Sequence, residues 1–546
     1  MSCQHKTTHH EKKQIPKSGF AGLKENWNSD MLSGFLVSLI ALPLCLGIAG
    51  ASGFPPVMGV LTAIIGGMIV SLFAGSELTI KGPAAGLIVI VAGAVEELGK
   101  GDPMLGWHLA LGVVVVAGII QVVFGLLKVA VMADFFPLSA VHGMLAAIGI
   151  IIMSKQLHFA LGADPATLKG KEPVELLEMI PHSLAHPNMQ IAIIGLVSLI
   201  ILFGMPLIKN KYVKAVPPAL MVLIAGILMG QLFHLTDPSI KNLKPLVDPG
   251  EFKIAYAVDF SAMTGETAMA FWKWVLMFTL IGSLESLLTG KAIDLLDPYK
   301  RKAKLSQDLT AVGIGNTLAG IFGGLPMISE VARSSANINN GGKTKWANFF
   351  HGVFLLVFVV ALVPVIKMVP MASLAAMLIF VGFRLASPKT FHHAYKVGRE
   401  QLAVFVITIV MTLFTDLLIG VASGIVLELV INYVNGLSPA KTFSADTEVE
   451  QHGSTYVVKI HNACTFSNWI SFNKVLSKIP AGHHLIVDVS DATLLDHTFM
   501  ENIHHFEDEY LADEGAKFEL RGVHDMKQNS GDQTSARIRK QPARIA

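Results

Sequence analysis

The stretch LTIKGPAAGLIVIVAGAV at residues 78–95 interrupts the long apolar runs on either side of it. It begins as an extended, helix-breaking segment through Gly82-Pro83 and continues as a short apolar piece at 83–95. Spanning about 30 Å of hydrocarbon takes about 20 apolar residues, so this piece is predicted to be a half-helix that starts in mid-membrane. The stretch GGLPMISEVARSSANINN at 323–340 has the same design, with its short piece at 328–340. Paired, interrupted segments of this kind are typical of transporters built from inverted repeats.

The composition also indicates a membrane protein. Of 546 residues, 52% are hydrophobic and only 15% are charged, whereas soluble proteins have about 25% charged residues. The net charge is +2 and the basic residues are dispersed among apolar runs, so nothing indicates nucleic-acid binding. The three cysteines are far apart and predict neither a disulfide framework nor a metal site.

Longer apolar runs surround the half-helices and complete two series. The first series has runs at 31–50, 56–74, 105–127, 138–153, 191–207 and 218–233. The second has runs at 272–289, 309–322, 349–366, 371–383, 402–418 and 419–434. With a half-helix as the third member of each series, the sequence predicts an α-helical polytopic transporter domain at 30–435. Its fourteen segments form 7+7 inverted repeats, with repeat 1 at about 30–236 and repeat 2 at about 271–435.

The distribution of basic residues predicts the orientation. Residues 1–29 are polar, lack the apolar core of a signal peptide, and are interpreted as a cytoplasmic N-terminal tail. The basic loops lie at 209–214, 300–304 and 384–399. The positive-inside rule puts these loops in the cytoplasm and the loops at 158–187 and 236–269 outside. We therefore expect a multi-pass protein of the inner (plasma) membrane with both termini cytoplasmic.

The C-terminal part has the composition of a soluble domain. At 440–526 we expect a small α/β domain, with buried strands at 455–460 and 484–489 and a helix at 499–511. The segment at 527–546 is polar and basic without periodicity, and is predicted to be a disordered tail.

Several motifs in order resemble the sulfate permease (SulP) family. They are Gly282-Ser283-Leu284-Glu285-Ser286-Leu287-Leu288-Thr289, Gly313-Ile314-Gly315-Asn316, Gly323-Gly324-Leu325-Pro326 with Ala332-Arg333-Ser334-Ser335-Ala336-Asn337, Ala41-Leu42-Pro43 and Gly82-Pro83. The C-terminal domain is similar to the STAS domain that follows the membrane part in that family. The resemblance implies two inverted repeats divided into a core and a gate domain, a homodimer, and transport of sulfate, bicarbonate, chloride or dicarboxylates.

The half-helices are the predicted anion site. A helix N-terminus offers unpaired N–H groups and about half a positive charge, and small residues let an anion approach the backbone. The predicted substrate-binding residues are Pro83, Ala84, Ala85 and Gly86 in the first half and Ser329, Glu330, Ala332, Arg333 and Ser334 in the second. The alternative is that both segments are merely short packed helices.

Glu285 is the predicted cation-coupling residue, together with Thr289. A carboxylate inside an apolar helix costs on the order of 3 kcal/mol, and Thr289 lies four residues on, on the same face. The resemblance implies that this position couples transport to a cation, either as a proton acceptor or, with Thr289, as an oxygen ligand for sodium. Alternatively, Glu285 is only a fixed partner for Arg333.

Arg333 and Glu330 raise a question of charge. Arg333 is similar to the arginine at the anion site of many family members, and its five donors suit an anion. Glu330 stands where the family commonly has a small residue, and its carboxylate would repel an anion unless it is protonated or paired with Arg333. In the C-terminal domain His497 occupies the place of the serine that is phosphorylated in soluble STAS relatives, and Phe499 that of the glycine, so a phosphoswitch is not expected.

These observations predict a secondary active transporter of a small anion (sulfate, bicarbonate or a dicarboxylate) that works by alternating access, coupled to H+ or Na+ and without another cofactor. Two alternatives share the architecture, an uncoupled anion channel or exchanger and a nucleobase transporter. An enzyme is not expected, because no nucleophile–base pair or metal-ligand spacing stands out. The expected partners are the anion, the lipid bilayer and a second copy of the chain, without nucleic acid.

Overall fold

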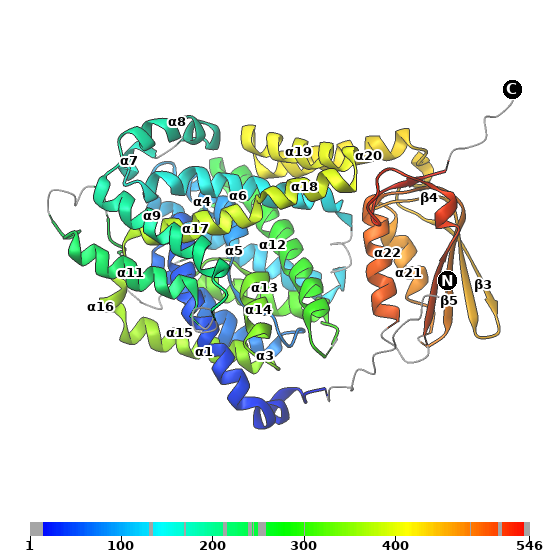
Figure 1. Ribbon diagram of the computed structural model, residues 1–546, viewed down its shortest axis with the longest axis horizontal. Coiled ribbons are helices and arrows are strands. Elements are labelled where there is room, and N and C mark those ends of the chain that lie inside the picture. Colours follow the sequence, from blue (N-terminus) through cyan, green and yellow to red (C-terminus); the bar gives the residue numbers. More distant parts are fainter. Residues whose placement is uncertain are drawn as a thin grey trace.

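The computed structural model describes residues 15–129, 135–168, 171–210, 216–237, 243, 245–248, 258–299, 301–480, 482–511 and 516–539. It consists of a helical bundle with a small α/β domain at one end, whose two helices face the bundle (Figure 1). Within the described residues, eight helices are long and apolar enough to cross a membrane, and two further apolar helices are shorter.

The first repeat contains the predicted seven segments. They are α1 (Gly19–Ala51), a continuous helix of α2 (Pro56–Ile65), η1 (Gly66–Val70) and α3 (Ser71–Phe73), the half-helix unit β1 (Ile80–Pro83), η2 (Ala85–Leu87) and α4 (Ile88–Gly99), then α5 (Pro103–Leu126), α6 (Leu138–Ala160), α9 (Met189–Gly204) and α11 (Pro218–Leu232). Between α6 and α9 lie α7 (Pro165–Leu168) and α8 (Pro173–Ala185).

The second repeat has the same order of elements. It contains α12 (Ala268–Leu296), α13 (Leu305–Ile321), the half-helix unit β2 (Met327–Glu330) and α14 (Val331–Asn339), α15 (Trp346–Ala361), α16 (Val363–Ile366), α17 (Met371–Leu385), α18 (Pro388–Val397), α19 (Arg399–Phe414) and α20 (Leu417–Val434). The prediction of fourteen segments in two series of seven is confirmed.

The helices pack in two groups, which correspond to the core and gate domains. One group contains α1, α2, α4, α5, α12, α13, α14 and α15, and the other contains α6, α9, α11, α17, α19 and α20. Contacts within each group outnumber those between them, which are made mainly by α1 with α17 and α11. The two half-helices therefore belong to the same body.

The C-terminal domain is a mixed sheet with two helices on one face. Its strands are β3 (Asp446–His452), β4 (Thr455–Cys464), β5 (His484–Leu495), β6 (Lys517–Arg521), β7 (Lys527–Gln528) and β8 (Arg537–Ile538), and its helices are α21 (Trp469–Leu476) and α22 (His497–Tyr510). The sheet order is β3-β4-β5-β8-β7, with β6 pairing β5. Trp469, Phe472 and Phe499 form the centre of its apolar core. The two predicted strands and the predicted helix are confirmed.

The prediction of a disordered tail at 527–546 is wrong for the strands β7 and β8, and residues 540–546 lie outside the described residues. Composition misled here because the basic side chain of Arg539 is satisfied by the backbone. Its guanidinium donates to the carbonyl oxygens of Val489, Ala492 and Gly522.

Several boundaries also differ from the prediction. α1 begins at Gly19, inside the expected tail, where the indole of Trp346 donates to the Gly19 carbonyl and the buried Asn26 donates to the Gly22 carbonyl. α6 continues beyond 153 to Ala160, and the buried His158 contacts Ser183 and the carbonyl of Leu176 on α8. Hydropathy underestimates the length of a helix whose polar side chains form hydrogen bonds inside the bundle. The expected tail residues 1–14 lie outside the described residues.

Candidate functional site

The two half-helix units meet in a short antiparallel β ladder. β1 pairs β2 with Ile80 opposite Glu330 and Pro83 opposite Met327. Each strand runs directly into its half-helix, so η2 and α14 begin at opposite ends of the same four-residue ladder. The predicted breaks are therefore present, and the alternative of two merely packed helices does not describe the hydrogen-bonded ladder.

Glu285 projects from α12 against the first half-helix. A Cβ atom at Gly86 would overlap the Glu285 carboxylate, so the carboxylate lies directly against η2. Glu285 is 8% exposed, and its Oε1 has no hydrogen-bond partner among the described residues. Thr289 is buried one turn along the same helix. A buried carboxylate oxygen without a partner is costly, and is free to accept a proton or to bind a cation.

Arg333 lies in the first turn of α14 and is 1% exposed. Its Nε lies 3.2 Å from Oε2 of Glu330, and its Nη2 donates to the carbonyl of Pro83 at 3.3 Å. Nη1 lies against Gly82 and has no hydrogen-bond partner among the described residues. Glu330, and not Glu285, is the counterion of Arg333, because no ion pair between Glu285 and Arg333 occurs in the described part of the chain.

The remaining predicted residues divide by exposure. Pro83, Ala84, Ala85 and Gly86 are buried, whereas Ala332 is exposed and its neighbour Val331 is 48% exposed. We call the N-terminal end of each half-helix its mouth. The mouth of α14 is exposed and is called open, and the mouth of the first half-helix is buried and is called closed.

The two predicted serines have structural bonds. The hydroxyl of Ser329 donates to Asp308, and its backbone N–H donates to the hydroxyl of Ser286. Ser334 donates to the carbonyl of Glu330 and accepts from the N–H of Ile80. Both hydroxyl groups hold the ladder together, so they are less available to a ligand than the prediction assumed.

A buried ion pair beside the ladder was missed by the sequence analysis. Lys81 of β1 is fully buried, and its Nζ lies 2.8 Å from Oδ1 of Asp308 on α13. Asp308 also accepts from the N–H groups of Gly75 and Ser76 and from Ser329, the residue opposite Lys81 in the ladder. The only signal in the sequence was an isolated charge in each of two apolar surroundings, which does not reveal the pairing.

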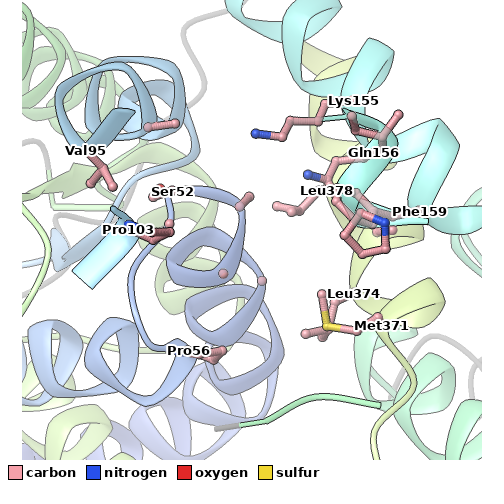
Figure 2. Close-up of a pocket in the computed structure, with 18 of the residues that line it drawn as sticks. Ser52, Pro56, Val95, Pro103, Lys155, Gln156, Phe159, Met371, Leu374 and Leu378 are labelled. Atoms are coloured by element: carbon pink, nitrogen blue, oxygen red, sulfur yellow. The ribbon is translucent and has the colours of Figure 1, made fainter. Parts of the chain in front are cut away.

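A cavity of about 380 Å³ separates the two groups of helices at the end of α6 remote from the C-terminal domain. Figure 2 shows Lys155, Gln156 and Phe159 of α6 on one wall and Ser52 and Val95 on the other. Leu46 and Gly47 also line it, directly after Cys45, whose thiol lies close to the Arg333 guanidinium. The predicted anion-site residues and Glu285 are not among its lining residues.

Comparison with known proteins identifies the family. The Sulfate permease family matches residues 27–408 of the chain. The chain belongs to the sulfate permease family. This assignment agrees with the motifs around Glu285 and Arg333, and with the STAS-type domain at the C-terminus.

Relatives and solved structures of this family support the fold. YvdB of Bacillus subtilis is 27% identical over 410 residues, covering 74% of this chain and 73% of YvdB. Bicarbonate transporter BicA of Picosynechococcus is 25% identical over 412 residues, covering 73% of this chain and 69% of BicA. The solved transmembrane domain of a cyanobacterium bicarbonate transporter BicA matches with a TM-score of 0.64 and 26% identity, covering 72% of this chain and 97% of that one. SLC26A9 shares the fold over 92% of this chain and 85% of its own, with a TM-score of 0.65 and 16% identity.

In this sulfate permease family member, the STAS-type domain contacts the bundle through Asp496 and the first turn of α22. Thr498 accepts from the N–H of Leu138 at the start of α6, and Asp496 accepts from Asn432 of α20 at 3.2 Å. Burial raises the pKa of the Asp496 carboxyl from 3.8 to about 6. Burial also lowers the pKa of His497, the residue at the place of the phosphorylated serine. The segment from Asp496 to Thr498 is therefore engaged in the interface with the helical bundle and is not free for phosphorylation.

Proposed function

We propose that the chain is a secondary active transporter of a small anion, namely sulfate, bicarbonate or a dicarboxylate, driven by H+ or Na+. The observation that carries this proposal is the buried guanidinium of Arg333, which lies against Gly82 and Pro83 of β1 with Nη1 unpartnered in the described part of the chain. A buried donor without a hydrogen-bond partner is costly unless a ligand completes its bond.

The mouth of α14 suits an anion for two further reasons. The side chain of the N-cap residue Glu330 makes no capping hydrogen bond, so it leaves the N–H groups of the first turn available to a ligand. The first residues of the helix, Val331 and Ala332, are exposed. The family membership and the bicarbonate transporters among the relatives point to the same class of substrate.

Glu285 provides the coupling in this proposal. Its carboxylate lies against Gly86 of the first half-helix, close enough to Glu330 for the two charges to repel each other. An anion would add to that repulsion. A proton or a sodium ion on Glu285 removes one negative charge, so cation and anion bind more favourably together than separately.

Alternating access follows from the two packed groups of helices. The site belongs to the core group, and the cavity of Figure 2 lies between this group and the gate group. Movement of the core against the gate closes this cavity and opens a path on the other side. We place both termini in the cytoplasm of a plasma-membrane protein that works as a homodimer.

Uptake into proteoliposomes tests the proposal. Labelled sulfate and bicarbonate are offered under imposed pH or sodium gradients, with wild type, Glu285→Gln and, as a surface control, Glu266→Gln, since Glu266 is exposed. We expect gradient-driven accumulation by wild type and by the control, and loss of the gradient dependence in Glu285→Gln. Conductance without accumulation would indicate the uncoupled channel, and uptake of nucleobases alone would replace the anion.

A further inference from the structure

Glu330 is a carboxylate at the mouth of a site for an anion, and the proposed function does not explain it. It is the N-cap residue of α14, yet its side chain makes no capping hydrogen bond. The carboxylate instead turns to Arg333, with Oε2 3.2 Å from Nε, and the side chain is 13% exposed. A ligand at the mouth of α14 therefore meets the partly exposed Glu330 carboxylate, a hydrogen-bond acceptor, with the buried Arg333 guanidinium paired to it.

These groups differ in what they can bond. The first-turn N–H groups of α14 and Nη1 of Arg333 are donors, which any oxyanion can satisfy. In its ionised form the Glu330 carboxylate, which is paired with Arg333, can only accept. An oxyanion without a proton brings its own lone pairs against those of Glu330, whereas an oxyanion that carries an O–H group can donate to it.

We infer that Glu330 makes the site selective for oxyanions that carry an O–H group, such as bicarbonate or hydrogen phosphate, over fully deprotonated oxyanions such as sulfate. This inference rests on the proposed function, because it assigns the substrate class of the same site. A binding site that is built to bond a substrate hydroxyl discriminates strongly against analogues that lack it, because its polar group is left unpaired. Since Glu330 is partly exposed, water satisfies part of its bonding, and we expect about tenfold to hundredfold discrimination.

Position also excludes the other carboxylates from this role. Glu285 lies against Gly86 at the closed half-helix and has no contact with Arg333 among the ion pairs of the described residues. Asp308 is saturated by Lys81, Ser329 and two backbone N–H groups. Glu330 is the carboxylate that combines partial exposure with contact to the anion-binding arginine.

The wild-type protein allows a first test that no misfolded variant can obscure. Hydrogen phosphate and sulfate are tetrahedral dianions of similar size at pH 8, and only hydrogen phosphate carries a proton. Each is added as a competitor of labelled bicarbonate uptake into proteoliposomes. We expect hydrogen phosphate to inhibit at about one-tenth of the sulfate concentration or less. Equal inhibition, or stronger inhibition by sulfate, would overturn the inference.

The second test exchanges the carboxylate for a group that can also donate. In Glu330→Gln the amide N–H can bond a deprotonated oxyanion, so we expect sulfate to inhibit about tenfold better than in wild type. A gain for one ligand cannot result from damage to the fold. Glu266→Gln, at an exposed position, is the matched control and should keep the wild-type preference.

The outcomes separate this inference from the proposed function. If wild type and Glu266→Gln take up neither bicarbonate nor sulfate, the proposed function fails, and the inference fails with it. If both anions are taken up and Glu330→Gln leaves their ratio unchanged, only the role of Glu330 is overturned.

Discussion

The two half-helix units occupy equivalent places in the two repeats but differ in exposure. At the first, Ala84 and Ala85 are 3% and 8% exposed and Gly86 lies against Glu285. At the second, Val331 is 48% exposed and Ala332 is exposed as well. The inverted repeats thus have similar backbones, and the surrounding side chains decide which of the two half-helices can receive a ligand.

The difference indicates a division of labour. The first unit is fixed by the Lys81–Asp308 pair and holds the partnerless carboxylate oxygen of Glu285. The second unit carries the Arg333–Glu330 pair at its open mouth. In the proposed mechanism the closed unit carries the coupling cation and the open unit carries the anion, so substitutions in the two units should have different consequences.

The largest effect is expected from breaking the ion pair that fixes the closed unit. Lys81→Met leaves Asp308 buried without its counterion, which typically destabilises a protein by about 3–5 kcal/mol. The apparent melting temperature of the detergent-solubilised protein should fall clearly. Lys81→Met combined with Asp308→Asn removes both charges and should recover part of the loss.

Lys100→Met is the matched control, because Lys100 is 63% exposed and pairs with the exposed Glu266. Surface pairs contribute about 0–1 kcal/mol, so this variant should melt close to wild type. A Lys81→Met protein as stable as the control would show that the closed unit does not depend on its ion pair.

A smaller effect is expected from one added methyl group at the closed mouth of the first half-helix. Gly86→Ala places a Cβ against the Glu285 carboxylate, and such overpacking costs about 1–3 kcal/mol. The displaced carboxylate should lose its role, so uptake should become independent of the pH or sodium gradient. In Gly50→Ala the added Cβ meets only Pro56 at 3.8 Å, and gradient-dependent uptake should persist. Retained coupling in Gly86→Ala would argue against Glu285 as the coupling residue.

Cysteine labelling compares the exposure of the two mouths without measuring transport. In a background with Cys3 replaced by Ser, the native Cys45 and Cys464 are both buried. An impermeant thiol reagent should modify Ala332→Cys faster than Ala84→Cys, by about tenfold or more, because reactivity follows exposure. Equal rates would mean that the two mouths are equally open, and the comparison would fail.

The sequence predicted the breaks in both half-helices because Gly, Pro and segment length are local signals. Lys81 and Asp308 each appear as a single charge in an apolar context, and no local pattern shows that they meet across the core. Exposure at Ala332 and burial at Ala84 depend on the packing of neighbouring helices, which two similar small residues cannot reveal. Pairing of Arg333 with Glu330 was one of the alternatives left open, and the side-chain geometry decides between them.

The smallest effect is expected at Asp496, which lies at the junction with α20 and not at either half-helix. Its pKa is raised by burial from 3.8 to about 6, so the folded state holds the proton more tightly than the unfolded state. The resulting stability is present at low pH and is lost as the pH rises through about 6. Hydrogen exchange around α22 should therefore be slower at pH 5 than at pH 7.5, after correction for the intrinsic rate, and Asp496→Asn should reduce that difference. Because the inferred selectivity resides at Glu330, the same variant should leave the preference between bicarbonate and sulfate unchanged. An altered preference would mean that the difference between the half-helices depends on the STAS-type domain and is not set by their own surroundings.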